Sequence, residues 1–424
     1  MELNEDEWLS RASELEDIGD LAQARIIYAH LVRIAAPSVK IHALNISTLI
    51  EIGDLDSAKS LLEILCPRSQ ETIFNHFMLL QIRYYKTVSD FEAEEYWCRR
   101  IDIPSATYPH IFLGSCLSRQ GEHDQAIAAH RKATEFPYEE GKTQPDEAWL
   151  NIALILRAKN DYQGALEAAN KALAFAPDYS DAKEVADDVS AAIELQKLKP
   201  GEEFEDPGAF KLAWEYKYAQ SFVITQKHLQ DEPDWVDGQS HFGVLLVDFR
   251  KFAEAENHIR FLQSPEYLKI VSDSYAEEDI DGSPEDEIRL AVLEVESALE
   301  LRRGNLEKAA QLLRRLIELQ PFRDTTAVDL GECLTSLQRY DEAIEVYASI
   351  RTTAIEEKRT SWPDEWAIKH SGHIHRSQQR YQEAAELYQI GAERYPDNDE
   401  FPKLANDCLA AIKLDQQLNE ESVN

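Results

Sequence analysis

The chain has little of what an all-β or membrane-embedded protein needs. Its 424 residues include 15 glycines and 16 prolines, which are few for an all-β protein, because such a protein needs many turns. No apolar run approaches the roughly 20 residues that cross a bilayer, and residues 243–247 are typical of the longest. The first residues are acidic, where a signal peptide is basic and then apolar. We therefore expect a cytoplasmic protein that is neither all-β nor inserted in a membrane.

The chain also lacks a cysteine framework. Its five cysteines lie far apart and form no Cys-x-x-Cys pair; they are Cys66, Cys98, Cys116, Cys333 and Cys408. An odd, scattered set of this kind favours reduced, half-buried thiols over disulfides or a zinc site.

Positive charge is scarce as well. The chain has 44 basic and 79 acidic residues, a formal net charge of −35. Such a charge disfavours nucleic acid and anionic membrane as partners. Hydrophobic residues make up 44% of the chain and aromatic residues 9%, which is enough for a buried core. The length exceeds one compact core, so we expect several domains or an elongated solenoid.

What the chain does contain is a repeated pattern. A small or polar residue is followed by Asp or another polar residue, an aromatic residue or Leu, two further positions, Ala, three further positions, and usually an aromatic residue or Leu. The first copy runs from Gly19 through Ala24 to Tyr28, and the second begins 34 residues later. Copies begin at Gly19, Gly53, Ser89 (a weaker copy), Gly121, Asn160, Arg250, Gly304, Gln338 and Gln379.

Each copy predicts a pair of antiparallel helices. Apolar residues within a copy fall at helical spacing, as at Ile152, Ile155 and Leu156. The Gly-Asp or Asn-Asp pair between the two helical stretches tolerates a left-handed turn. The Ala at the fixed position lets the two helices approach closely. Because one pair cannot bury its own apolar face, we expect neighbouring pairs to stack around a common core.

The pattern resembles the tetratricopeptide repeat, whose unit is a 34-residue helix–turn–helix. Further positions of that family agree. A Trp opens the first helix and a Pro closes the second, at Trp8, Trp149, Pro177, Pro321 and Pro396. The resemblance covers about three-quarters of the chain and implies an all-α, right-handed α-solenoid of about nine to ten repeats.

The register breaks between the fifth and sixth copies, where residues 199–208 are rich in Pro, Gly and acid. We expect an N-terminal block over 1–198, with five repeats and a capping helix, and a C-terminal block over 209–420. The C-terminal block would hold a degenerate first helix, four repeats and an amphipathic capping helix that shields the last apolar face. Residues 199–208 would form a linker, either rigid or hinged, and residues 421–424 a disordered tail.

Catalytic and metal-binding motifs are incomplete. Residues 141–143 resemble the end of a phosphate-binding loop, but Phe136 stands where the first Gly is required. His370, His373 and His375 form the densest histidine cluster; the first two share a helix face, with no Cys or well-placed carboxylate to complete a metal site. We therefore expect no enzyme, no cofactor, no metal and no small-molecule substrate.

In tetratricopeptide proteins, the first helices of the repeats line a concave groove that takes a segment of a partner protein. The resemblance places nine candidate partner-binding residues in that groove: Arg83, Lys86, Tyr108, Arg119, Arg157, Trp366, Lys369, His373 and Arg376. In the repeat of Arg157, the family's inner-face positions are Glu147, Leu150, Leu154 and Arg157. The cations among them would favour an acidic stretch of the partner, with Tyr108 and Trp366 as apolar anchors. The alternative is that these cations neutralise acidic side chains on neighbouring repeats.

The resemblance thus implies a non-enzymatic scaffold or adaptor that grips a partner protein or peptide in its concave groove. The alternative is a regulatory or inhibitory subunit, or a sensor, that changes the shape of its superhelix on binding a peptide or a basic partner. In that case the acidic outer face would matter more than the groove.

Overall fold

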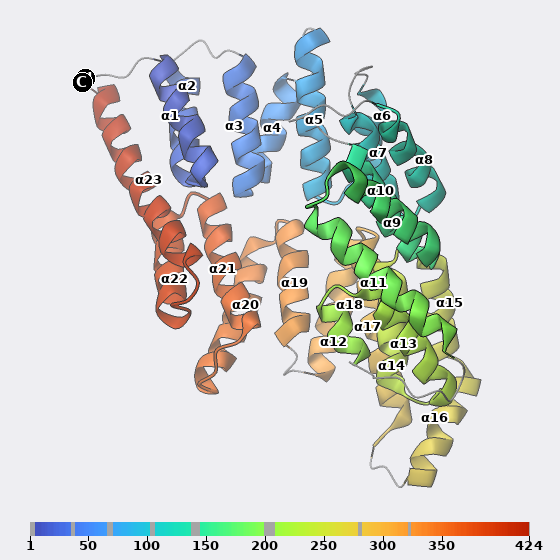
Figure 1. Ribbon diagram of the computed structural model, residues 1–424. Coiled ribbons are helices and arrows are strands. Elements are labelled where there is room, and N and C mark those ends of the chain that lie inside the picture. Colours follow the sequence, from blue (N-terminus) through green and yellow to red (C-terminus); the bar gives the residue numbers. More distant parts are fainter. Residues whose placement is uncertain are drawn as a thin grey trace. The chain divides into compact units, whose positions relative to one another are not determined.

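The computed structural model describes residues 5–34, 39–65, 71–101, 107–136, 145–198, 208–278, 282–320 and 324–423. All regular structure in these segments is α-helical, in 23 helices (Figure 1). The predicted all-α class is confirmed. The linker, residues 199–207, lies outside the described residues, as does Cys66.

The helices group into two compact units. Unit 1 comprises 1–97 together with 321–424, and unit 2 comprises 98–320. Unit 1 contains α1 (Glu5–Ile18), α2 (Leu21–Ile34), α3 (Val39–Ile52), α4 (Leu55–Leu65), α5 (Glu71–Thr87), most of α6 (Phe91–Arg100), α19 (Asp324–Ser336), α20 (Tyr340–Glu356), α21 (Trp362–Ser377), α22 (Tyr381–Arg394) and α23 (Glu400–Val423).

Unit 2 holds the middle of the chain. It contains α7 (Tyr108–Arg119), α8 (His123–Thr134), α9 (Pro145–Ala158), α10 (Tyr162–Phe175), α11 (Ser180–Lys197), α12 (Ala209–Trp214), α13 (Tyr218–Asp231), α14 (Val236–Asp248), α15 (Phe252–Leu262), α16 (Pro265–Glu278), α17 (Pro284–Arg302) and α18 (Leu306–Leu319).

The turns between paired helices confirm the register of the sequence pattern. The residue that opens each of the nine copies adopts a left-handed backbone, with φ between 57° and 87°. Five residues later comes the fixed Ala, which is completely buried in all eight copies that have it: Ala24, Ala58, Ala126, Ala165, Ala255, Ala309, Ala343 and Ala384. A side chain larger than Ala at these places would separate the paired helices.

A tenth turn of the same kind lies between α12 and α13. Tyr216 has φ of 60°, and the position of the fixed Ala is taken by Ser221, which is also completely buried. The sequence pattern missed this copy because neither residue fits it. Here α12 is only one and a half turns long, and α11, the long helix before it, packs on both α10 and α13.

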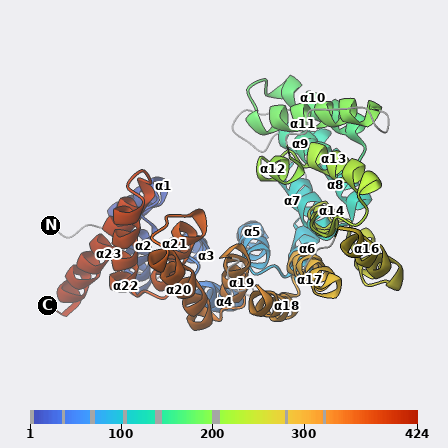
Figure 2. The same cartoon turned by 90° about the horizontal axis from the view of Figure 1, so that it is seen from below.

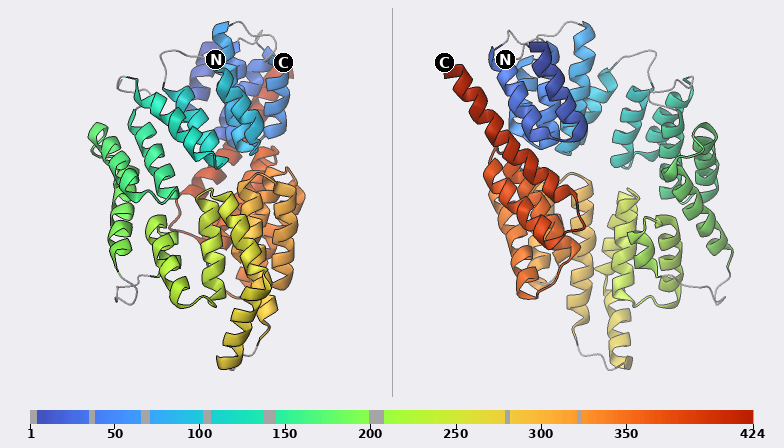
Figure 3. Two further views of the ribbon diagram at one scale, coloured as in Figure 1. Left: turned by 90° about the vertical axis from the view of Figure 1, so that its right-hand side faces the viewer. Right: turned by 60° about the vertical axis from the view of Figure 1, so that its left-hand side comes forward.

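Unit 1 is assembled from both ends of the chain. The C-terminal α23 packs on α22 with one side and on the N-terminal α2 with the other (Figures 2 and 3, where α23 is red and the N-terminal helices are blue). One apolar core joins them, with Ile27, Leu31, Tyr388, Phe401 and Cys408 all buried in it. The predicted capping helix is therefore covered by the first helical pair rather than left as the end of the stack.

This arrangement differs from the two blocks expected from the sequence. Those blocks were divided at a break in register, whereas unit 1 combines the start of the first block with the end of the second. The tail also differs: α23 extends to Val423, so residues 421–423 are helical rather than disordered.

Tight turns approach one another closely within unit 2. Gly121 has φ of 81°, and a Cβ built on it would lie 2.7 Å from the carbonyl oxygen of Arg250, which opens another copy of the pattern. His123 Nε2 lies 3.0 Å from the carbonyl oxygen of Phe249 at the same place. Only glycine combines this φ with so close a backbone contact.

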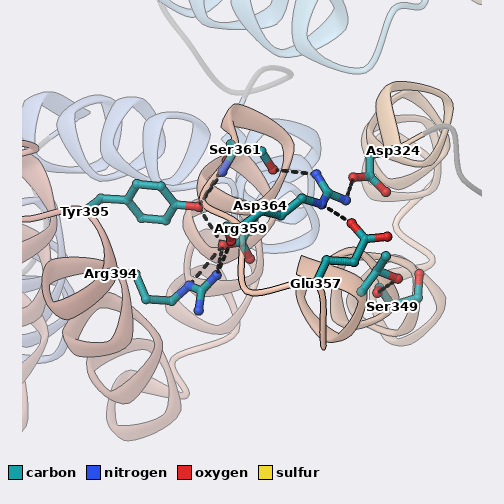
Figure 4. A network of polar contacts seen from close by, with 9 residues as sticks. Asp324, Ser349, Glu357, Arg359, Ser361, Asp364, Arg394 and Tyr395 are labelled. Carbon is teal, nitrogen blue, oxygen red and sulfur yellow. Dashed lines mark hydrogen bonds and ion pairs between the residues drawn. The ribbon is translucent and has the colours of Figure 1, made fainter. Parts of the chain in front are cut away.

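In unit 1, a polar network positions the start of α21 (Figure 4). The buried carboxylate of Asp364 accepts hydrogen bonds from Arg394, at 3.0 and 2.7 Å, and from the Tyr395 hydroxyl at 2.6 Å. Arg359 pairs with Asp324 on α19, and its carbonyl accepts a bond from Arg394 Nη2 at 3.1 Å. Burial and the bond to Asp364 raise the pKa of Tyr395 to about 12.

Candidate functional site

A pocket of about 640 Å³ opens between α9, α11 and the turn that leads into α13. Its α9 wall consists of Leu150, Leu154 and Arg157, which are three of the positions that the resemblance assigns to the inner face of that helix. The sequence therefore predicted these residues to share one surface, and the structure brings them together at a hollow of unit 2.

The buried carboxylate of Asp188 forms one wall of the pocket and caps α13. Its side chain is 2% exposed and accepts hydrogen bonds from the backbone N–H groups of Ala219, at 3.0 Å, and Gln220, at 3.1 Å, with a third from Gln220 Nε2 at 3.3 Å. The first N–H groups of a helix have no partner within it, and the N-cap residue Lys217 supplies none from its side chain. A carboxylate from α11 thus does what an N-cap side chain usually does.

Arg157 is held in place by several groups at once. Its Nη1 donates to Asp188 Oδ2 at 3.1 Å and to the carbonyl of Tyr216 at 3.5 Å. Its guanidinium lies over the ring of Tyr218, 5.4 Å from the ring centre. The side chain is 13% exposed, and its buried Nε has no acceptor among the described residues.

The rim of the pocket is acidic and aromatic. Three exposed carboxylates of α11, Asp181, Glu184 and Asp187, face the turn that carries Glu215, Tyr216 and Lys217. Lys217 and Glu215 form an ion pair at 2.6 Å, and their hydrogen bond lowers the pKa of Glu215 and raises that of Lys217. Asp181, Glu184 and Asp187 form no ion pair in the described part of the chain. Tyr216 is 71% exposed.

The other predicted site residues lie on three separate helices. On α5, Arg83 pairs with Glu51 at 2.7 Å and with Ser47 Oγ at 2.8 Å, while Lys86 is exposed. On α7, Arg119 is partly buried, and partial burial raises the pKa of Tyr108.

The remaining four lie on α21. Trp366 donates its indole N–H to Glu332 at 2.8 Å, and Lys369 pairs with Glu400 at 2.6 Å. The buried Arg376 faces Asp407 at 3.8 Å. His373 has a pKa far below the usual value because it is buried, and its Nε2 has no partner among the described residues.

These contacts favour the alternative in which the predicted cations neutralise acidic side chains on neighbouring repeats. Arg83, Arg157, Lys369 and Arg376 each face a carboxylate of a neighbouring helix. Their charge is therefore already balanced within the chain, which leaves less of it to attract an acidic partner.

Unit 1 contains a second copy of the Arg157–Asp188 arrangement, 219 residues further on. Asp407 of α23 is buried and accepts hydrogen bonds from the backbone N–H groups of Ala22, at 3.0 Å, and Gln23, at 3.2 Å, and from Gln23 Nε2 at 3.4 Å. Arg376 lies beside it as Arg157 does beside Asp188. Burial raises the pKa of Asp407.

The sequence contains a signal for this duplication that the repeat pattern did not use. Residues 186–195 read ADDVSAAIEL and residues 405–414 read ANDCLAAIKL, with six of the ten positions identical. The capping carboxylates, Asp188 and Asp407, fall at the same place in the two segments. Aligning α11 with α23 would therefore have identified both residues.

Other kinds of site were also sought in the described segments. They contain no group of three His, Cys, Asp or Glu residues that could hold a metal ion. No described helix is long and apolar enough to cross a membrane. The four described cysteines are buried and in none of them does the sulfur form a disulfide, and burial raises the pKa of Cys408 to about 12.

Comparison with protein families identifies the helical pair at the pocket. Residues 146–179, which span α9 and α10, match the tetratricopeptide repeat family. This helical pair is therefore a tetratricopeptide repeat. Residues 281–358 match a second family, described as the bacterial transcriptional activator domain. No curated protein matches the chain.

Solved structures give distant matches. A tetratricopeptide repeat protein from Parabacteroides merdae is 12% identical over 72% of this chain and 98% of its own, with a TM-score of 0.32. The TPR domain of P58(IPK) is 14% identical over 97% of this chain and 99% of its own, with a TM-score of 0.27. A chain of the APC/C hetero-tetramer Cut9-Hcn1 is 14% identical over 99% of this chain and 90% of its own, with a TM-score of 0.30. TM-scores this low carry no argument about this chain.

Proposed function

We propose that this protein is a non-enzymatic, cytoplasmic scaffold or adaptor that binds a segment of a partner protein at the pocket of unit 2. The observation that carries the proposal is the hollow between α9, α11 and the α12–α13 turn, which is lined by inner-face residues Leu150 and Leu154 and by the exposed Tyr216. Apolar walls beside an exposed aromatic side chain are typical of the few residues that dominate binding energy at protein interfaces.

The walls of the pocket are ordered before any partner arrives. Asp188 accepts four hydrogen bonds, and Arg157 is fixed by Asp188 and by the ring of Tyr218. Groups that are already immobilised lose little conformational entropy on binding, so the partner segment bears most of the ordering cost.

Site-specific crosslinking tests the proposal. A photoreactive phenylalanine in place of Tyr216 should capture a partner protein in cells, whereas the same residue in place of Phe261, a partly exposed aromatic residue of the same unit, should not capture it. Mass spectrometry identifies the captured protein, and its affinity is then measured with purified components.

The matched variant is Tyr216→Asn. Asn160 has the equivalent left-handed turn position in the adjacent repeat, and Asn adopts this backbone readily, so the turn should survive. Removing the ring should weaken binding about tenfold or more. Equal capture from both positions, or unchanged affinity of Tyr216→Asn, would contradict the proposal.

A second candidate is a regulatory subunit, which the match of residues 281–358 to the bacterial transcriptional activator domain favours. In that role, partner binding would alter the shape of the protein or its contact with nucleic acid. The expected absence of nucleic-acid binding rests on the net charge alone, and this match gives it no support. Small-angle scattering with and without the captured partner, and a gel-shift assay with duplex DNA at low salt, distinguish this role from rigid display.

A further inference from the structure

The two copies of the arginine–carboxylate arrangement differ in what surrounds them. In unit 1, Lys369 of α21 forms an ion pair of 2.6 Å with Glu400 of α23. The residues 219 positions earlier are Leu150 and Asp181, both at the pocket of unit 2. Unit 2 thus has a carboxylate, Asp181, in place of Glu400, but a leucine in place of the lysine that pairs with it.

Two further positions are more negative in unit 2 than in unit 1. Where unit 1 has Lys403 and Asn406, unit 2 has Glu184 and Asp187. The four corresponding positions have a summed formal charge of +1 in unit 1 and −3 in unit 2. At these four positions the repeated framework is therefore negative in unit 2 and positive in unit 1.

The difference coincides with the pocket. The hollow of about 640 Å³ lies where the acidic rim is. Arg157 does not neutralise the charge of the rim, because it forms an ion pair with Asp188 at 3.1 Å. Lys217 is likewise paired with Glu215, at 2.6 Å. Asp181, Glu184 and Asp187 therefore provide negative charge that no cation of the described residues balances.

We propose that the pocket of unit 2 accepts a lysine or arginine side chain of the partner segment, whose cationic group takes the place that Lys369 occupies within unit 1. The inference rests on the proposed function and names the chemistry that the pocket recognises.

The walls suit both ends of such a side chain. Its methylene stem packs on Leu150, Leu154 and Val185, while its charged group reaches the rim carboxylates. A basic side chain offers the stem and the cation together, whereas a bare metal ion offers only charge.

Peptide selection provides the test. The probe is a random dodecapeptide library displayed on phage and selected on the full-length protein; bound peptides are resynthesised and their affinities measured by fluorescence anisotropy. We expect one position to be enriched in Lys or Arg beside an apolar residue. Replacing that residue by Gln should weaken binding about tenfold or more, and rising salt should weaken it further.

Two variants separate this inference from general acidity. Asp181→Lys combined with Glu184→Lys changes only exposed rim residues and should reject the basic peptides. Asp231→Lys combined with Glu266→Lys makes the same change of charge at exposed sites of the unit that are not part of the pocket and should bind normally. Leu150→Lys installs the lysine of unit 1 and should close the site, with a thermal melt as its folding control.

The outcomes distinguish the two proposals. Peptides that depend on Tyr216 but have no preferred basic position would overturn this inference and leave the proposed function standing. Peptides whose binding is indifferent to Tyr216, Asp181 and Glu184 would overturn both. Free arginine or spermidine competing as well as the basic peptide would show that the site recognises a small cation rather than a peptide segment, which also contradicts the inference.

Discussion

The same capping contact is made at two helix junctions. In unit 2 it joins α11 to α13, and in unit 1 it joins α23 to α2. In both, a buried carboxylate caps the next helix of the stack, and an arginine of the preceding repeat lies beside it. In unit 2 the two helices are close in the chain, with only the short α12 between them, whereas in unit 1 they come from its opposite ends. The repeated register therefore suffices to position the capping carboxylate, and chain continuity between the two helices is not required.

The comparison also separates framework from surface. The capping groups correspond residue for residue, while the summed charge at the four surrounding positions changes from +1 in unit 1 to −3 in unit 2, where a pocket is present. Buried groups that satisfy helix N–H donors are costly to change, but exposed charges at the rim vary with little effect on folding. Binding specificity can therefore differ between two copies of one framework.

The largest expected effect comes from breaking the unit 1 junction outright by removing residues 1–34. This deletion takes Ile27 and Leu31 from the core shared with α23, and each such buried side chain contributes about 1.5–3 kcal/mol. Hydrogen exchange should show loss of protection in α22 and α23, with α9 and α10 as the internal control. Removing residues 420–424 should have little effect. Unchanged protection of α23 in the first deletion would mean that the N-terminal pair does not cover it.

The next largest effect is expected at the capping carboxylates. Asp188→Ala leaves Arg157 and two helix N–H groups buried without their partner, a change that costs about 3–5 kcal/mol. Asp407→Ala should cost less, because Arg376 lies 3.8 Å from its carboxylate rather than 3.1 Å. Urea unfolding measures both values.

The matched control is Asp161→Ala. Asp161 is exposed and caps α10 through its own bond to the N–H of Gly164, at 3.0 Å, and loss of such a cap costs about 1 kcal/mol. If the Asp161 and Asp188 variants lost equal stability, the special role assigned to the buried carboxylate would be wrong.

Acidification should affect α21 more than α9. Burial lowers the pKa of His370 to about 4 and holds that of His373 well below its usual value, whereas the corresponding residues of unit 2 are Asn151 and Leu154. Below pH ~6.5 these histidines bind protons in the unfolded chain but stay neutral in the folded protein. The free energy of unfolding therefore falls as the pH drops from about 6.5 to 4.

Exchanging the residues between units tests this explanation. The double change His370→Asn and His373→Leu should reduce the loss of thermal stability between pH 7 and pH 5. Lys369 and Arg376, which also lower the pKa of His373, remain in place in this variant. An unchanged pH dependence would assign the acid sensitivity to other buried histidines, such as His130 and His241.

The smallest effect is expected at a half-exposed pair. Arg83→Ala removes the ion pair with Glu51, whose partners are both more than two-fifths exposed, so the loss of stability should stay within about 1 kcal/mol. Arg83→Gln is the control for side-chain packing. If Arg83→Ala instead weakened partner binding strongly without altering the melt, Arg83 would be part of a binding surface rather than a neutraliser.

The local part of this architecture could be predicted from the sequence because it depends on neighbours along the chain. A left-handed turn at Gly19 or Asn160 and a close helix approach at Ala24 or Ala165 require particular residues at fixed spacing. The turn at Tyr216 was missed because the surrounding helices impose its backbone on a residue that does not favour it.

The candidate site could be predicted only in part. The repeat register placed Leu150, Leu154 and Arg157 on one face, as found. It could not show that Arg157 faces Asp188, or that the Tyr216 turn forms the opposite wall, because both depend on how α11 lies against its neighbours. For the same reason, the sequence did not reveal the ion pairs that Arg83, Lys369 and Arg376 form with carboxylates of other helices.

The amino-acid sequence alone determined the helical pairs, their register, the buried alanines and the negative charge, since each follows from residue type and spacing over one repeat unit. Tertiary structure decided which pairs meet: that the first helical pair covers the last helix, that two carboxylates 219 residues apart have one role, and that a hollow forms beside Asp188. Such contacts depend on burial of apolar faces that several chain folds could satisfy, and only packing in three dimensions selects among them.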